Sequence, residues 1–151
     1  MVLRQPRLAD GPVLAVGNPR KANGARRRAT VRWLKAQRRP CWMCGLGIDY
    51  GETSGPLSFN CDELVPVSRG GSPYDHDNVD AAHACCNQWR KARPVQDVRA
   101  VRAQVISRFG GWSSPLQFVA LCKALKASSA STDVPATAKV DVAPMSTSTD
   151  W

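Results

Sequence analysis

Two pairs of side chains in this sequence have the spacing of metal ligands. The first is Cys41-x-x-Cys44 and the second is His83-x-x-Cys86. Three thiolates and one imidazole form the closed tetrahedral set of a structural zinc site. Taken alone, the first pair also fits a redox pair, although no thioredoxin-like pattern surrounds it, and the second also fits buried residues at a helix start. Together they predict structural Zn²⁺ held by all four, with Cys85 as a competitor for the place of Cys86.

A zinc ion with four protein ligands has no position left for substrate, so any reaction must take place elsewhere. The candidate is a pair of adjacent carboxylates, Asp62 and Glu63, in the segment NCDELVPVSRGG (60–71) between the two ligand pairs. The alternative for these acids is a solvated surface pair. Cys61 and Cys122 lie outside any metal-ligand spacing, and we interpret both as small core residues.

Further motifs surround the two acids in a definite order. The chain contains, in sequence, the segments CWMC (41–44), DELVP (62–66), SRGG (68–71), DN (77–78) and HACCN (83–87). This order resembles the HNH endonucleases, and most of all their zinc-containing phage-type members, over about residues 40–92. The resemblance implies an α+β protein with a small ββα-metal (HNH or treble-clef-like) core, a structural zinc and flanking helices. In such a core two antiparallel strands and a helix clasp one catalytic divalent ion.

The resemblance also assigns roles to single residues. Asp62, at the end of the first strand, and Asn87, at the start of the helix, take the places of the ligands of the catalytic ion. Asn78 takes the place of the Asn that steadies the loop between the strands, and Arg90 or Lys91 takes the basic place near the phosphate. The chemistry agrees, because phosphodiester hydrolysis needs a hard cation and oxygen ligands suit Mg²⁺ or Mn²⁺. The expected activity is metal-dependent hydrolysis of DNA, as nicks or double-strand breaks.

Glu63 departs from the family, which usually has a histidine here as the general base on the attacking water. A carboxylate is ordinarily a weaker base than an imidazole. Three interpretations stay open: Glu63 is the base of a Glu-adapted variant, it is a further metal ligand, or the enzyme is weak or inactive. His76, two residues before Asn78, is either a substitute base or a solvated loop residue.

Basic residues are clustered in this chain of 151 residues, whose formal net charge is +9. No Asp or Glu lies between Asp10 and Asp49. Such clustering favours a polyanionic partner, and we predict double-stranded DNA, with a basic surface that only serves solubility as the alternative. Trp33, Trp42 and Trp89 either fill the core or stack on bases. The residues expected to contact DNA are Arg26, Arg27, Arg28, Arg32, Arg69, Arg90 and Lys91.

Periodicity and breakers divide the chain into four parts. We expect a flexible basic arm at 1–24, an HNH nuclease domain at 25–110, a C-terminal helix at 111–127 and a disordered low-complexity tail at 128–151. The first element expected is a basic helix over 25–39 that Pro40 stops, and Thr30 caps it if it starts later. A strand or hairpin arm is expected in 56–67, and a turn followed by a helix in 81–92. Two further helices are expected, one over 95–109 that Gly110 ends and one over 115–127.

The sequence has no apolar run approaching the roughly 20 residues that cross a membrane, and no convincing signal-peptide core. We therefore expect no membrane partner and a cytoplasmic protein, in the host cytoplasm if a phage encodes it, where metal binding is favoured over disulfides.

Two competing hypotheses remain. One is a non-catalytic zinc module that binds nucleic acid, and the other is a zinc adaptor that docks a protein partner, such as packaging machinery, through residues 115–127.

Overall fold

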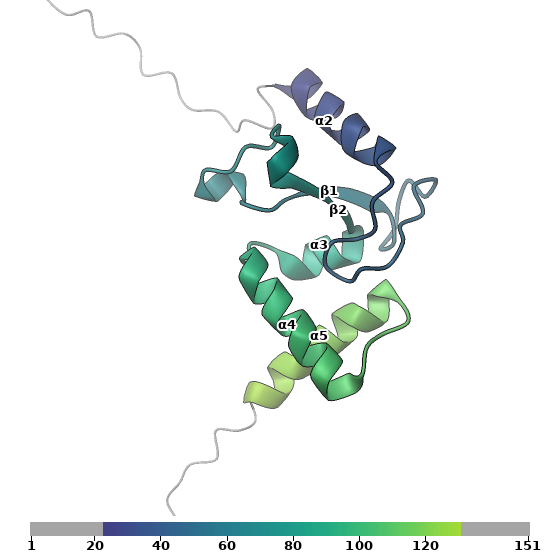
Figure 1. The fold of residues 1–151 in the computed structure, drawn as a ribbon, viewed down its shortest axis with the longest axis vertical. Coiled ribbons are helices and arrows are strands. Elements are labelled where there is room, and N and C mark those ends of the chain that lie inside the picture. Colours follow the sequence, from purple (N-terminus) through teal and green to yellow (C-terminus); the bar gives the residue numbers. More distant parts are fainter. Residues whose placement is uncertain (1–22, 131–151) are drawn as a thin grey trace, which may run out of the picture.

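The computed structural model describes residues 23–130 (Figure 1). Nearly all of the arm predicted at 1–24, and the tail predicted at 128–151 apart from its first three residues, lie outside the described residues. The helices are α2 (Gly24–Ala36), α3 (Ala84–Arg90), α4 (Val95–Phe109) and α5 (Pro115–Ala130), and the strands are β1 (Phe59–Glu63) and β2 (Val79–His83). The fold is therefore mixed α+β, as the sequence predicts.

The two strands form an antiparallel pair, in which Phe59 lies opposite His83 and Glu63 lies opposite Val79. The strand predicted within 56–67 is present but shorter, because Pro56 and Pro66 flank it and proline cannot donate to a ladder. The turn predicted at the start of 81–92 is wrong, since β2 runs through these residues directly into α3. The segments β1, β2 and α3 thus follow one another in the order strand, strand, helix.

Helix α2 covers one side of the strand pair and carries many of the basic residues (Figure 1). It begins at Gly24 and ends at Ala36, four residues before Pro40. The suggestion that Thr30 caps a later start is wrong, because Thr30 is buried within the helix and its hydroxyl donates to Tyr74 O at 3.3 Å. That contact ties α2 to the loop between the strands.

Helices α4 and α5 cross on the side of α3 away from α2 (Figure 1). Val98 and Val105 form the buried face of α4, and Gly110, with a φ of 79°, ends the helix as predicted. Phe118 of α5 packs edge-on against Trp89 of α3, with ring centroids 5.6 Å apart. The 111–127 segment is therefore part of the same hydrophobic core as the strand pair, and its helix continues to Ala130.

Within residues 23–130, no helix is long and apolar enough to cross a membrane.

Candidate metal centre

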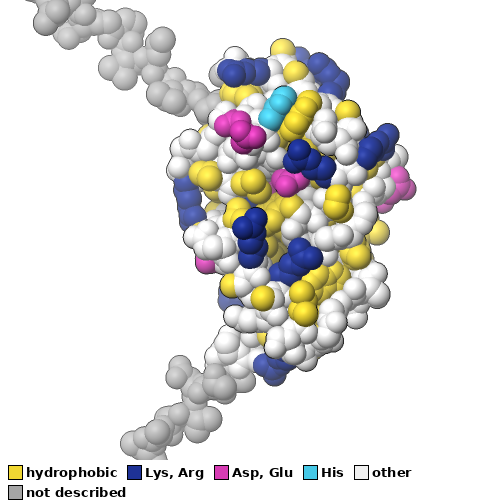
Figure 2. Space-filling view, viewed as in Figure 1, with side chains coloured by type: hydrophobic (Ala, Val, Ile, Leu, Met, Phe, Trp, Pro, Cys, Tyr) yellow, Lys and Arg dark blue, Asp and Glu magenta, His cyan; other side chains and the backbone are white. Residues whose placement is uncertain are grey.

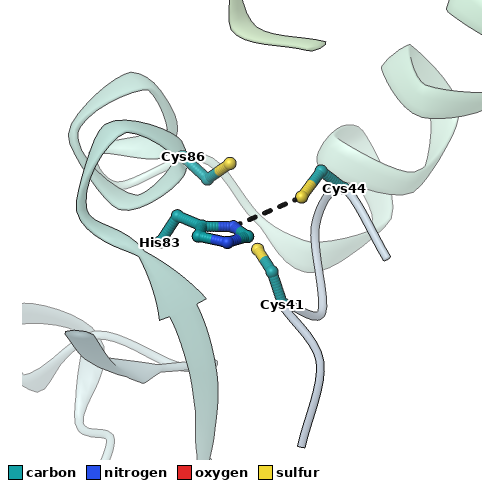
Figure 3. A group of neighbouring side chains, drawn as sticks. All are labelled: Cys41, Cys44, His83 and Cys86. Atoms are coloured by element: carbon teal, nitrogen blue, oxygen red, sulfur yellow. Dashed lines mark hydrogen bonds between the residues drawn. The ribbon is translucent and has the colours of Figure 1, made fainter. Parts of the chain in front are cut away.

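Four buried side chains converge on one point between the 41–44 turn and the β2–α3 junction (Figure 3). The ligand atoms of Cys41, Cys44, His83 and Cys86 all lie within 4.8 Å of one another. Cys44 Sγ lies 3.4 Å from His83 Nδ1. Tetrahedral zinc, with bonds of about 2.3 Å to sulfur and about 2.0 Å to nitrogen, would hold these two atoms about 3.5 Å apart. The four predicted ligands therefore come together in a group that can hold a metal ion such as zinc.

The first ligand pair lies in a turn that backbone hydrogen bonds close. Gly45 N donates to Cys41 O at 2.8 Å, and Cys41 N donates to Leu46 O at 2.9 Å. Gly45 has a φ of 75°, a left-handed conformation that glycine adopts without steric cost. These bonds fold the chain around the centre, so the Cys41 and Cys44 thiols face the same point.

The second pair comes from the junction where β2 becomes α3. His83 is the last residue of the strand, and Cys86 lies in the first turn of the helix. The first amides of α3 have no side-chain cap; instead Cys85 N donates to Pro56 O at 2.8 Å and Ala84 N donates to Ser58 O at 2.9 Å. The junction is thereby fixed, and it directs Cys86 to the centre while Cys85 lies outside the ligand group.

The His83 ring is oriented by a second contact. Its Nε2 lies 3.1 Å from Gly47 O, so this nitrogen carries the proton and Nδ1 is left to face the sulfurs. Hydrogen bonds from the Cys44 and Cys86 thiols lower the pKa of Cys41, and the bond to Cys41 raises the pKa of Cys44 to about 12. Zinc binds thiolates, so the lowered pKa of Cys41 favours the ligand form, whereas Cys44 must lose a proton when the ion binds.

Asp62 lies beside this centre and is held by both of its halves. Its Oδ2 accepts a hydrogen bond from Trp42 Nε1 at 2.9 Å and another from Arg90 Nη1 at 2.6 Å. Trp42 follows Cys41 in the turn, and Arg90 lies one helical turn after Cys86. Burial raises the pKa of the Asp62 carboxyl, and the Arg90 charge and these hydrogen bonds oppose that shift. The metal centre and the carboxylate are therefore positioned by the same two segments.

Arg90 is buried, with no exposed surface. Besides Asp62, its guanidinium donates to Glu63 O at 2.7 Å, to Leu64 O at 2.6 Å and to Arg93 O at 3.0 Å. The prediction that Arg90 contacts DNA is wrong for this structure, because every nitrogen of the guanidinium already donates to the protein.

Glu63 has a different partner from its neighbour. Its Oε1 lies 2.9 Å from Arg27 Nη2 of α2, whereas Asp62 is held from the opposite direction by α3 and the 41–44 turn, as expected for successive residues of a strand. Arg27 also donates to Pro73 O at 2.7 Å and Cys61 O at 3.1 Å. Arg27 therefore joins α2 to β1, with its side chain 18% exposed, and its contact with DNA stays a prediction.

The loop between the strands is closed by Asn78. Its Oδ1 accepts from Val65 N at 2.9 Å, and its Nδ2 donates to Val65 O and to Ser72 O, each at 3.0 Å. A Cβ on Gly71 would lie 1.8 Å from Val65 O, so only glycine fits here. Asn78 thus makes the loop contacts that the resemblance implies, and the Gly of SRGG has a steric reason.

The remaining predicted site residues are placed as follows. Asn87 is half-buried on α3, three residues before Arg90 and so on the same side of the helix, and its side chain has no hydrogen-bond partner within residues 23–130. His76 is exposed and stacks on Trp33, with ring centroids 3.6 Å apart and planes 5° apart. Trp89 fills the core, whereas the half-buried Trp42 holds Asp62.

Several basic side chains remain at the surface, where Lys and Arg are spread from the α2 end toward α5 (Figure 2). None of them forms an ion pair with an acid of the described part of the chain. The predicted DNA-binding residues in this exposed set are Arg26, Arg28, Arg32, Arg69 and Lys91.

Sequence reasoning missed one residue at the centre. Trp112, between α4 and α5, donates from Nε1 to Cys44 O at 2.9 Å and packs against Phe118 with centroids 4.7 Å apart. A lone tryptophan after a Gly-Gly pair gives no signal of such a contact, which spans 68 residues of sequence.

Comparisons of the chain with protein-family models, curated proteins and solved structures find no match.

Proposed function

We propose that the protein is a zinc-stabilised DNA endonuclease of the HNH type, which hydrolyses phosphodiester bonds with a divalent ion held by Asp62 and Asn87. Two lines support this proposal: the ordered motifs over residues 40–92 and one observation at Asp62. Both hydrogen bonds that the described residues give to its side chain go to Oδ2. The carboxylate is thus anchored through one oxygen, and Oδ1 is left to bind a cation.

The surroundings of Asp62 suit such a role. A carboxylate fixed by two donors is preorganised, so little entropy is lost when it takes up an ion. Asn87 adds an amide oxygen on the side of α3 that faces Asp62, and oxygen donors of this kind are preferred by Mg²⁺ and Mn²⁺. When bound, the ion supplies electrostatic stabilisation of the charge that develops on the phosphate and the leaving oxygen. The exposed arginines of α2 and Arg69 supply the positive charge that holds the DNA backbone nearby.

The proposal leaves the role of Glu63 as general base to be decided. The ion pair with Arg27 directs the Glu63 carboxylate toward α2, whereas Asp62 is held by α3 and the 41–44 turn. The same pair favours a second candidate function, a zinc module that binds nucleic acid without cleaving it. In that case Asp62, Glu63 and their two arginines serve the fold alone.

The test is a nicking assay on supercoiled plasmid, with zinc-loaded protein and with Mg²⁺, Mn²⁺ or no added ion. The parent is expected to nick only with added ion, and Asn87→Ala is expected to lose this activity while keeping zinc and fold, because its side chain has no hydrogen-bond partner within residues 23–130. Glu63→Gln separates the interpretations of Glu63, because retained nicking excludes it as the base. DNA binding without nicking by the parent under all three conditions would favour the non-catalytic module.

A further inference from the structure

Two adjoining hollows lie between α3, α4 and α5. Their volumes are about 340 and 460 Å³, and they share Trp89, Arg93 and Lys123 among their lining residues. Cys85 and Trp89 form part of the α3 wall, whereas Cys86 and Arg90 of the same helix face the metal centre and Asp62. We call the two hollows together the α5 groove.

The α5 groove is lined by four basic residues and by no acidic one. The basic residues are Lys91 at the end of α3, Arg93 in the following turn, and Lys123 and Lys126 on α5. The three lysines are exposed, and none of the four forms an ion pair with an acid of residues 23–130. Like charges gathered in one depression repel each other, so this arrangement favours a ligand that brings several negative charges.

The shape and the other lining residues narrow the class of ligand. Leu116 is 51% exposed at the rim, and Trp89 and Val119 lie deeper in the groove. A surface of cations with apolar patches between them suits a sugar-phosphate backbone, whose phosphates are charged and whose sugars have apolar faces. An acidic protein segment would also meet the charges, but the chain as a whole has a net charge of +9 and exposes further arginines on α2. A long polyanion can reach both basic surfaces.

We propose that the α5 groove binds the phosphodiester backbone of DNA through Lys91, Arg93, Lys123 and Lys126. The inference rests on the proposed function only in taking DNA as the partner. It assigns α5 a role in binding nucleic acid, and it adds three basic residues to the interface. Trp89 of α3 lines the groove and Arg90 of the same helix holds Asp62, so DNA in the groove would contact the helix that positions that carboxylate.

The test measures binding of the full, zinc-loaded chain to a short DNA duplex by fluorescence anisotropy, at several salt concentrations and without added Mg²⁺ or Mn²⁺. The groove variant is Lys123→Ala/Lys126→Ala, and the matched control is Arg99→Ala/Arg108→Ala, which removes the same charge from exposed helical positions that do not line the groove. Alanine keeps the helices, because its helix propensity is the highest.

The groove variant is expected to bind about tenfold or more weaker, and the slope of log K against log salt should fall by about 2, because each lost phosphate contact removes about 0.9. The control should keep the parental slope. Equal effects of the two variants, an unchanged slope in the groove variant, or capture of an acidic protein instead of DNA would each overturn the inference.

A separate nicking assay keeps this inference distinct from the proposed function. If the parent nicks DNA and the groove variant binds like the parent, the groove inference alone fails. If the parent binds DNA through the groove and never nicks, the nuclease proposal fails and the groove inference stands. A parent that binds no DNA overturns both.

Discussion

The guanidinium of Arg90 lies 2.6 Å from the carboxylate of Asp62, and the two side chains are 0% and 7% exposed. A charge buried to this degree depends on its partner, since removing one member of such a pair leaves the other without solvation or a counter-charge. The pair therefore links the end of β1 to the end of α3, whatever further role Asp62 has.

We expect Arg90→Met to destabilise the zinc-loaded protein by about 3–5 kcal/mol, because Asp62 would stay buried and lose its strongest partner. Urea unfolding followed by circular dichroism measures this change. The control is Arg39→Met, which breaks the half-exposed pair with Asp80 at 3.6 Å and should cost at most about 1 kcal/mol. Similar losses for the two variants would show that burial gives the Arg90 pair no special weight.

Removal of zinc should unfold the domain. The four side chains are buried, and three of them lie within the hydrophobic core, so loss of the ion leaves thiolates that either repel one another or must take up protons. We expect one zinc per chain by metal analysis, and loss of the near-UV signal on addition of a strong chelator. Neighbouring cysteines provide the control: Cys86→Ala should lose the zinc, and Cys85→Ala should keep it. Equal zinc content in both variants would exclude Cys86 as a ligand.

Gly71→Ala should destabilise the protein by at least about 2 kcal/mol, because its Cβ would lie 1.8 Å from Val65 O and force the loop away from β1. Gly47→Ala is the matched control, since its Cβ meets no atom within 4 Å. Thermal unfolding of both variants with zinc present compares them. A melting temperature of Gly71→Ala equal to that of the control would mean that the loop can move at no cost.

Burial raises the pKa of the Cys122 thiol from 9.0 to about 11. The unfolded chain therefore loses this proton at lower pH than the folded one. Below about pH 9 both states hold the proton, and between pH 9 and 11 the folded state is disfavoured as pH rises. Compared with Cys122→Ala, the parent should lose stability over this range. Parallel stability curves for parent and variant between pH 8 and 11 would contradict the shift.

The sequence predicts those parts of the fold that depend on local pattern. The helix over 95–109 and its end at Gly110 follow from apolar spacing and a breaker, and the four candidate metal ligands follow from two short motifs. Local pattern does not predict strand β2, which only the family resemblance implies, because VDAAH has little apolar alternation and is fixed by pairing with β1.

Contacts between distant segments explain why the ion pairs of two arginines are not predicted from the sequence. Arg27 and Arg90 look like surface cations in sequence, and each pairs with a carboxylate of β1 that lies 28 or more residues away along the chain. Such pairings cannot be read from spacing, because they depend on how α2 and α3 dock on the strands. The composition alone makes both residues equally good candidates for DNA contact.

Helix α3 has seven residues, of which only Gln88 is exposed. Cys86 serves the metal centre, Arg90 serves Asp62, and Cys85 and Trp89 serve the groove and the core. A one-residue insertion or deletion in this helix would turn every later side chain by about 100° and break all of these contacts together. Natural relatives of the chain should therefore keep the length of this helix fixed.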